Sequence, residues 1–462
     1  MTPKKGARTA GQPFALVPAV ALLTPLLLGV ALWNGFPLVF YDTGAYVAQG
    51  LAGAFFVERS PIYSLMLPAS GAFISLWLTA AVQALMTAYL VAELVRAEVP
   101  RLTLKGLLAI GVTLMLLTGI GWYVGQIEPD CFTPLVVIGG YLLLFHAGAL
   151  PRWRLVAVIA ITCLAVASHP SHIGLIGGLV ICAGMAWGLH RKMPSLPRPR
   201  LGPCLSALAL SLALLVTANF AYTREVFVSR AGHVFLLARL MQDGIVQRLL
   251  ADVCLPPGQP QPYTLCPYRA RLPRNANAWL WGEHSSFHVL GGFMRSDGEY
   301  GRIVGDSLAR YPGMHLKAAV TESVTQFFLF KTGDGIESQE TILTRPFQEI
   351  IPRQLPAYLA ARQQNQEIRF RLINIVHVPV GMVAMIGLFF LLQHATLRRR
   401  WREVMLPATV LLALLGNAVI CGTFSNPHSR YQSRLIWLPV LVLLLARARD
   451  PRALQPVPDQ SS

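Results

Sequence analysis

Apolar runs of roughly 18 to 22 residues recur along the chain, separated by short polar connections. Each run is long enough to cross a hydrocarbon core about 30 Å thick as a helix, which satisfies its own backbone hydrogen bonds there. This pattern predicts ten spans, at residues 13–33, 72–95, 104–122, 131–149, 154–168, 172–189, 203–221, 371–392, 404–422 and 433–446. The fifth and the tenth are short, which suggests a tilt, a kink or a shifted boundary.

Composition supports an all-helical polytopic membrane protein. Of the 462 residues, 54% are hydrophobic and 13% are charged, whereas about a quarter of the residues of a soluble domain are charged. The basic start resembles a secretory signal, but the apolar run that follows is too long for one and no cleavage site of small residues comes after it. We therefore expect an uncleaved first span.

The net charge of +17 is explained by position along the chain. Basic residues gather in every second connection, which the positive-inside rule assigns to the cytoplasm. Both termini are then cytoplasmic, and a nucleic-acid partner is not expected. The basic residues are Lys4, Lys5, Arg8, Arg96, Arg101, Lys105, Arg152, Arg154, Arg191, Lys192, Arg198, Arg200, Arg398, Arg399, Arg400, Arg402, Arg447, Arg449 and Arg452.

One long hydrophilic segment, residues 222–370, is predicted to lie outside the cytoplasm. It divides the chain into a first membrane module of seven spans, residues 1–221, an extracytoplasmic domain, and a second module of three spans, residues 371–462. Apolar residues recur at helical spacing within the segment. This predicts helices at 233–253, from about 297 to 310, and at 314–331.

Cysteine placement fits the same topology. Cys254 and Cys266 end the loop "CLPPGQPQPYTLC", where an oxidising compartment favours a disulfide. The other five cysteines lie in or near spans, as small apolar packing residues do: Cys131, Cys163, Cys182, Cys204 and Cys421. We expect a bacterial inner membrane, with residues 222–370 periplasmic.

An aromatic loop follows the disulfide loop. The stretch "PRNANAWLWGEHSSFHVLGGF" contains Trp279, Trp281, His284 and Phe287 among glycines. Such residues are suited to stacking on sugars and equally to anchoring at a membrane interface. The sequence leaves both open.

Polar residues that the topology does not explain all fall in outer connections. A site that needs an acid, a base and a cation at one membrane face is assembled in this way. The connections contribute Asp42, Glu58 and Arg59; Gln126, Glu128 and Asp130; His169 and His172; and His428, Arg430, Tyr431 and Arg434.

Structural alternatives exist for the acids. Asp42 precedes "TGAYVAQGLA" and is also suited to cap a short helix. Glu128 and Asp130 flank Pro129 ahead of the fourth span, where acids favour the positive end of a helix dipole. For Arg430 and Arg434 the functional interpretation is stronger, because paired guanidinium groups match phosphate oxygens.

Histidine and acid spacing gives no metal motif. His169 and His172 could bind zinc at i and i+3, but no third ligand stands at a recognised spacing, and they are also suited to satisfy backbone groups around Pro170. Asp42 and Asp130 could share a divalent cation, again without a motif. We therefore predict no metal and no cofactor.

The first outer connection and the fourth span resemble a known class. "FYDTGAYVAQG" followed by "ERSPIYSLML", and the acid-headed span "EPDCFTPLVVIGGYLLL", are similar to polytopic membrane glycosyltransferases of the GT-C type. The resemblance covers mainly residues 13–150 and the overall topology. Many members have two adjacent acids in the first loop, whereas Asp42 stands alone.

The resemblance implies transfer of a sugar from a polyprenyl-phosphate carrier to an acceptor hydroxyl, with inversion. It implies Asp42 as general base, with Asp130 as the second candidate. The expected partners are the lipid-linked donor, membrane lipids and an acceptor that is a glycan, a lipid or a protein. Cations and histidines would bind the leaving phosphate, namely Arg59, His169, His172, His428, Arg430 and Arg434.

Two other functions remain open. An O-antigen polymerase or ligase would use His428, Arg430 and Arg434, and Asp42 would be expendable. A transporter or a non-enzymatic assembly protein for envelope polysaccharide would tolerate substitution of the outer acids, but transporters place polar residues at mid-membrane, where these spans have few.

Overall fold

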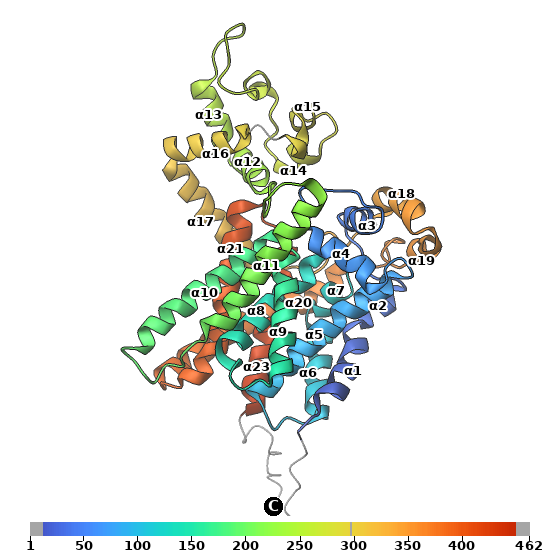
Figure 1. The fold of residues 1–462 in the computed structure, drawn as a ribbon, viewed down its shortest axis with the longest axis vertical. Coiled ribbons are helices and arrows are strands. Elements are labelled where there is room, and N and C mark those ends of the chain that lie inside the picture. The colour runs from blue at the N-terminus through green and yellow to red at the C-terminus, as the bar shows by residue number, and fades with distance from the viewer. Residues whose placement is uncertain (1–12, 296–297, 450–462) are drawn as a thin grey trace, which may run out of the picture.

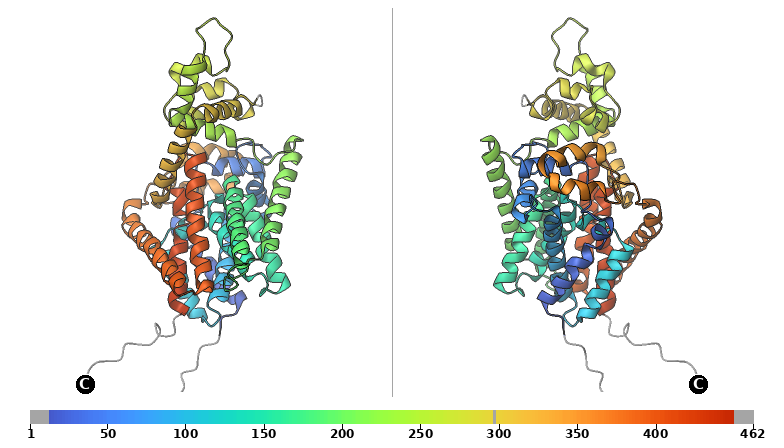
Figure 2. Two further views of the ribbon diagram at one scale, coloured as in Figure 1. Left: turned by 90° about the vertical axis from the view of Figure 1, so that its left-hand side faces the viewer. Right: turned by 90° about the vertical axis from the view of Figure 1, so that its right-hand side faces the viewer.

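The computed structural model describes residues 13–295 and 298–449, and within those ranges every named element is a helix (Figures 1 and 2). An isolated β-bridge joins Leu38 to Gln126. The predicted all-helical fold is thus confirmed. Four basic residues of the charge pattern, Lys4, Lys5, Arg8 and Arg452, lie outside the described residues.

Eight helices of the described chain are long and apolar enough to cross a membrane. They coincide with eight of the ten predicted spans. Their bounds are Leu16–Asn34 (α1 and α2), Leu76–Glu98 (α5), Pro129–His146 (η1, α8 and η2), Pro170–His190 (α10), Leu201–Thr223 (α11), Phe370–Leu397 (α20), Trp401–Phe424 (α21) and Arg430–Arg449 (α22 and α23).

The two other predicted spans are shorter helices inside the same bundle. The span predicted at 104–122 is α6, Leu104–Leu117, followed by α7, Ile120–Val124, because Thr118 leaves the helical conformation. The span predicted at 154–168 is α9, Arg152–Ala167, with 16 residues. Ten passes would place the start of α1 and the end of α23 at the same end of the bundle, as Figure 1 shows.

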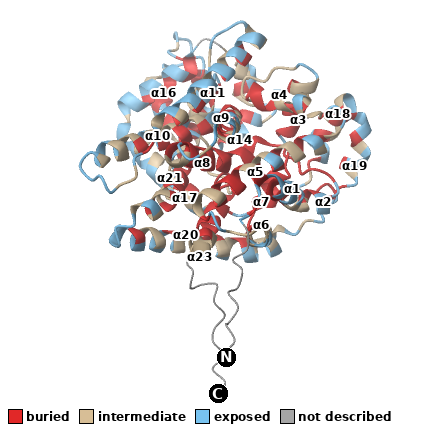
Figure 3. Cartoon of the chain, turned by 60° about the horizontal axis from the view of Figure 1, so that its bottom comes forward, coloured by how far each residue is buried: buried red, intermediate tan, exposed pale blue. Residues whose placement is uncertain are grey.

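The bundle is built around α8 and α5. In the span that contains α8, 89% of the residues are buried, against 22% for α20, so α8 is central and α20 peripheral. Buried residues, red in Figure 3, gather around these helices. Gln83 of α5 donates to the carbonyls of Val124 and Gln126 and accepts from the Tyr63 hydroxyl at 2.7 Å. This amide therefore fixes the connection that carries Glu128.

A fully paired polar cluster lies at the end of the bundle where α23 stops. Glu93 of α5 forms a buried ion pair with Arg154 of α9. Glu98 accepts from the Tyr141 hydroxyl at 2.6 Å and contacts His146 Nε2 at 3.0 Å. Arg449 of α23 also pairs with Glu98. These contacts tie α5, α8, α9 and α23 together.

The opposite end of the bundle carries a separate domain, residues 225–311, which we call the outer domain (Figure 1). Its helices share one apolar core that includes Leu237, Leu249, Trp279, Phe287 and Ile303. They are α12 (Gly232–Gln242), α13 (Ile245–Val253), η3 (Cys266–Arg271), α14 (Ala276–Trp281), α15 (Ser286–Val289), η4 (Gly292–Met294) and α16 (Glu299–Arg310).

The outer domain contains a helix break and a disulfide. The helix predicted at 233–253 is broken at Asp243 and Gly244, where the glycine has a positive φ of 76°. A disulfide joins Cys254 to Cys266. The remaining five cysteines are free, and four of them are buried.

The predicted domain 222–370 does not share a single core. After Tyr311, helix α17 (Pro312–Phe328) leaves the outer domain and runs along α21 (Figure 1). A side chain at Gly422 of α21 would meet the backbone of Glu322, so the glycine permits this close packing. Helices α18 (Glu340–Ile350) and α19 (Leu355–Leu359) then add Leu343, Phe347 and Tyr358 to the core of the bundle.

Candidate functional site

A cavity of about 590 Å³ lies between the outer end of the bundle and the outer domain. Its lining comes from six separate parts of the chain, and the first of them includes the turns before α3 (Thr43–Leu51) and α4 (Pro61–Ser70). The residues predicted from outer connections that line it are Asp42, Glu58, Arg59, Glu128, His169, His428, Arg430 and Tyr431. Polar residues scattered over almost 400 positions of sequence thus face one space.

Asp42 stands at the N-cap position of α3 but makes no capping hydrogen bond. Its Oδ1 instead accepts from Nη2 of Arg59 at 2.6 Å. The turn is held by Thr43, whose hydroxyl donates to the Ile127 carbonyl and accepts from the backbone N–H of Phe40, both at 2.9 Å. The helix-cap alternative therefore does not describe this side chain.

Arg59 is positioned by the start of α4. The neighbouring Ser60 hydroxyl donates to the Ala167 carbonyl at 2.6 Å and accepts from the N–H of Ile62, which fixes the turn against α9. The Arg59 guanidinium binds Asp42 through Nη2, but its Nε is buried without a hydrogen-bond partner among the described residues. One donor of this arginine is left over.

Arg430 opens α22 (Arg430–Ser433) and stacks on two aromatic rings. Its guanidinium carbon lies 4.2 Å from the ring centroid of Phe40 and 4.8 Å from that of Tyr431. Its Nη2 donates to the Tyr431 hydroxyl at 3.3 Å, whereas Nε and Nη1 are buried with no hydrogen-bond partner in the described chain. The nearest acids to Nη1 are Glu128 and Asp130, each at 4.0 Å. Phe40 keeps its place because Gly335, at a positive φ of 78°, leaves room for its ring.

The connection that carries His428 and Arg430 is held by hydrogen bonds from two residues earlier in the chain, Gln326 and Asp334. Gln326 of α17 accepts from the backbone N–H of His428 and donates to its carbonyl, both at 2.9 Å. Asp334 accepts from the backbone N–H of Arg430 at 3.1 Å and lies 3.5 Å from Nδ1 of His428. Burial alone would raise the pKa of Asp334, but the contacts with His428 and the Arg430 backbone outweigh it and the pKa is lowered.

Glu128 is a buried acid in the same cavity. Its Oε2 has no hydrogen-bond partner among the described residues, and its Oε1 lies 4.0 Å from Nη1 of Arg430. Burial raises the pKa of Glu128 well above its ordinary value, and the nearby Asp42 and Asp130 raise it further. The protonated form is therefore favoured.

Two further titratable side chains of the lining are also shifted towards neutrality. Burial raises the pKa of Glu58. Burial, followed by the neighbouring His172, lowers the pKa of His169 well below its ordinary value. The Nδ1 atom of His169 accepts from the N–H of Ser171, so this histidine also caps α10.

Three of the predicted site residues lie behind the cavity wall and are not part of its lining. Arg434 is fully buried, pairs with Asp130 and donates to Asn417 Oδ1 at 3.2 Å. His172 is held between the Thr133 hydroxyl and the Ala165 carbonyl, each at 2.7 Å. Arg430 and Arg434 are thus not presented together as the paired forks that we expected.

Several lining residues were not among the predicted site residues. Tyr41 and Tyr46 come from the first outer connection, where Asp42, Glu58 and Arg59 were singled out. Trp281 belongs to the aromatic loop, which did carry a signal, while Trp279 of the same loop is fully buried in the outer domain. Asp334 does not line the cavity but holds the backbone of Arg430. It carried no signal, because nothing in the sequence relates it to a connection almost 100 residues away.

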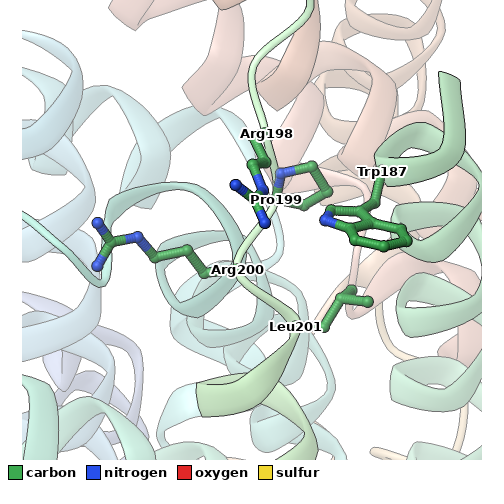
Figure 4. A pocket seen from close by; sticks show the side chains of 5 residues that line it. All are labelled: Trp187, Arg198, Pro199, Arg200 and Leu201. Atoms are coloured by element: carbon green, nitrogen blue, oxygen red, sulfur yellow. The ribbon is translucent and has the colours of Figure 1, made fainter. Parts of the chain in front are cut away.

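A second hollow, of about 640 Å³, lies at the other end of the bundle between α10 and α11 (Figure 4). It is lined by Trp187, Arg198, Pro199, Arg200 and Leu201, and in Figure 4 Arg200 points away from Trp187. It has no acid, so the basic residues here follow the expected charge pattern of membrane connections.

Within residues 13–295 and 298–449, no group of three or more histidine, cysteine, aspartate or glutamate side chains is arranged to hold a metal ion. No protein-family model matches the chain, no curated protein matches it, and no solved structure matches it. Its function therefore has to be inferred from the chemistry of the cavity.

Proposed function

We propose that this protein is a membrane glycosyltransferase that moves a sugar from a polyprenyl-phosphate carrier to an acceptor hydroxyl at the end of the bundle covered by the outer domain. One observation supports this most strongly. A single cavity is lined by Asp42, Arg59 and Arg430, and each arginine has at least one buried N–H group without a hydrogen-bond partner among the described residues.

Unpaired buried donors favour an anionic ligand. A buried polar group without a partner destabilises a protein by about 1 to 3 kcal/mol, and more if it is charged. Arg430 has two such nitrogens and Arg59 has one. Guanidinium groups bind phosphate oxygens through paired hydrogen bonds, and both arginines line the cavity, so a phosphate is the ligand that these side chains favour.

The cavity also has an apolar margin between two membrane helices. Pro170 and Gly174 of α10, and Ile420 and Phe424 of α21, belong to its lining. Because both helices are long and apolar enough to cross a bilayer, a phosphate attached to a hydrocarbon chain fits this position better than a water-soluble nucleotide sugar does. The carrier is therefore a lipid phosphate.

The reaction follows from the arrangement of acid and cations. Oδ1 of Asp42 is bonded to Arg59, which leaves Oδ2 to accept the proton of the acceptor hydroxyl as general base. The acceptor oxygen forms a bond to the anomeric carbon while the bond from that carbon to the phosphate oxygen breaks. The lipid phosphate leaves with the electron pair and is stabilised by Arg430 and Arg59. A single displacement inverts the anomeric carbon.

Glu128 has a supporting role in this scheme. Since burial favours its protonated form, its carboxyl group is a hydrogen-bond donor rather than a second base. It lies 4.0 Å from Arg430, so it can donate to an oxygen of the phosphate that this arginine binds. Protonation also avoids placing another negative charge beside the departing anion.

In the proposed setting the outer domain is periplasmic, both termini are cytoplasmic and the membrane is the inner membrane of a bacterium. The apolar helices and the basic connections support this orientation.

A polymerase or ligase acting on lipid-linked glycans is the second candidate. His428 and Arg430 line the same cavity, and the 3.5 Å contact between His428 and Asp334 would orient the imidazole as a base. In that enzyme His428 would be essential and Asp42 would not.

Replacing the chromosomal gene with the Asp42→Asn variant tests the proposal. We expect the glycan defect of a gene deletion, with accumulation of the polyprenyl-phosphate sugar, measured by mass spectrometry of extracted lipids and envelope glycans. The variant protein should still insert and accumulate in membranes. Asp252→Asn is a matched control, because Asp252 is partly exposed on the outer domain and pairs with Arg248 away from the cavity. Normal glycans in Asp42→Asn, with a defect in His428→Ala, would reject the proposed base and favour the second candidate.

A further inference from the structure

The two walls of the cavity differ in charge. The wall formed by the bundle carries Asp42, Glu58, Arg59, Glu128 and Arg430. The wall formed by the outer domain has no acid, lysine or arginine among its described lining residues, which are Ser229, Ala231, Gly232, His233, Phe235, Leu236, Ala276, Asn277, Leu280 and Trp281. The proposed reaction uses only the charged wall, so the neutral wall has no assigned role.

Trp281 is the largest side chain of the neutral wall. It ends α14, two residues after Trp279, but the two indoles have different surroundings. Trp279 is fully buried and donates to the Ser286 hydroxyl at 3.2 Å, whereas Trp281 is 47% exposed. An indole left half exposed on a cavity wall offers an aromatic surface to a ligand.

The position of Trp281 is defined on two sides. Its ring centroid lies 5.6 Å from that of Phe293, and the guanidinium carbon of Arg59 lies 5.9 Å from its ring. Arg59 in turn binds Asp42 at 2.6 Å. The same arginine therefore contacts both the indole and the proposed base.

Polar but uncharged atoms lie on this wall and beside it, where Asn426 of the connection after α21 meets Asn277. Asn277 of α14 accepts from Nδ2 of Asn426 at 3.4 Å, and Oδ1 of Asn426 is buried with no partner in the described chain. Burial lowers the pKa of His233, which favours a neutral imidazole. An aromatic face bordered by amides and a neutral imidazole matches a ligand with apolar C–H faces and hydroxyl edges.

We propose that this neutral wall is a saccharide subsite, in which an uncharged sugar ring stacks on Trp281 and its hydroxyl groups bond to Asn277, Asn426 and His233. The inference rests on the proposed function and adds to it that at least one of the two substrates presents a neutral sugar to the outer domain. An anionic sugar would leave its charge without a partner on this wall, so neutral hexoses, deoxyhexoses or pentoses are the class selected.

Fluorine NMR of the full-length protein in nanodiscs, labelled with fluorotryptophan, tests this directly. The chain has nine tryptophans, and the Trp281→Phe variant identifies the Trp281 resonance by its loss. A panel of methyl glycosides of neutral hexoses, deoxyhexoses and pentoses is titrated at millimolar concentration. We expect at least one glycoside to shift the Trp281 resonance saturably while the Trp153 resonance, from a residue 62% exposed at the other end of the bundle, stays in place.

An activity measurement gives the second readout. Trp281→Ala is expected to lower glycan transfer in cells about tenfold, the upper range for one aromatic contact. Trp281→Phe keeps a ring and should retain most of the transfer, whereas Trp153→Ala should retain all of it. Equal loss in Trp281→Ala and Trp281→Phe would contradict stacking.

The alternative role of this indole, anchoring at the membrane interface, has its own signature. Spin-labelled lipids in the nanodisc would broaden the Trp281 resonance, and no glycoside would shift it; that result overturns the subsite. A Trp281 resonance that no glycoside moves, together with loss of transfer in Asp42→Asn, would reject the subsite alone. A shifting resonance with full transfer in Asp42→Asn would reject the transferase and leave a sugar-binding site.

Discussion

Two clusters of buried charge lie at opposite ends of the helical bundle, and they differ in how completely their polar atoms are paired. At the end where α23 stops, both oxygens of Glu93 accept from Arg154, and Glu98 is bonded to Tyr141, His146 and Arg449. No side-chain atom of these two glutamates appears without a partner in the described chain. This cluster joins four helices and is complete without a ligand.

The cluster under the outer domain is incomplete. Arg59, Glu128 and Arg430 each keep at least one buried atom without a hydrogen bond, and all three face a cavity. Incomplete pairing together with a place in the cavity lining therefore distinguishes polar residues available to a substrate from those that connect helices. Asp130 and Arg434 pair with each other. Nε of Arg434 is also buried without a hydrogen bond in the described chain, but neither residue lines the cavity, so both support the site from behind its wall.

The proposed difference between the two clusters is wrong if Arg430 proves dispensable for transfer. Arg430→Gln should lower transfer about a hundred- to a thousandfold, as expected for one donor to a developing anion. The thermal unfolding temperature of the purified protein should be unchanged or higher, because unpaired buried nitrogens are removed. Arg345→Gln, on an exposed part of α18, is the control. A large loss of stability in Arg430→Gln would place this residue with the structural cluster.

The converse is expected for Glu93. Removing one partner of a buried ion pair destabilises a protein by about 3 to 5 kcal/mol, because the other charge is left unpaired. Glu93→Gln should therefore lower the unfolding temperature in detergent, while transfer per folded molecule stays at the level of the parent protein. Glu403→Gln disrupts an exposed pair and should change neither quantity. Reduced transfer per folded molecule in Glu93→Gln would contradict a purely structural role.

A smaller and local effect is expected from the disulfide. Replacing Cys254 and Cys266 with serine should destabilise the outer domain by about 2 to 3 kcal/mol, since the short loop between them is no longer closed. Limited proteolysis should then cleave residues 225–311 sooner, with the bundle still intact. Unfolding of the bundle at the same denaturant concentration as the outer domain would show instead that the two are one cooperative unit.

The smallest expected effect is a change in pH dependence. Because burial raises the pKa of Glu128 in the folded protein, the stability linked to its proton is fully present below the ordinary carboxyl pKa and is lost as pH rises through the raised value. Glu128→Gln imitates the protonated form and should flatten this part of the curve of unfolding temperature against pH. An identical curve in the variant would mean that Glu128 is ionised throughout.

The fold followed from the sequence because long apolar runs have few solutions in a bilayer. Eight predicted spans correspond to helices of sufficient length, and the break at Thr118 was missed because threonine gives no strong signal in an apolar run. Helix α17 was assigned to the extracytoplasmic domain 222–370 because it lies in the long hydrophilic segment. Its contact with α21 depends on Gly422, more than 90 residues later, which no local pattern reports.

The cavity could be foreseen only in part. The sequence analysis identified Asp42, Arg59 and Arg430 because charged residues are rare in the outer connections, so each one there suggested a functional role. The sequence could not show which arginine is paired with an acid. Arg434 and Asp130 are 304 residues apart, and only the packing of the helices brings them together. The sequence also could not show which of Trp279 and Trp281 is buried, because that depends on how α14 packs in the outer domain.

The two hydrogen bonds between the Gln326 side chain and the backbone of His428 set a limit for protein engineering. A shortened version without the outer domain must retain the chain from Pro312 onward, because a deletion that included α17 would strip two main-chain partners from the segment leading to Arg430. The natural excision points are therefore the junctions after Thr223 and before Pro312, and a version cut there would isolate the charged wall for study by itself.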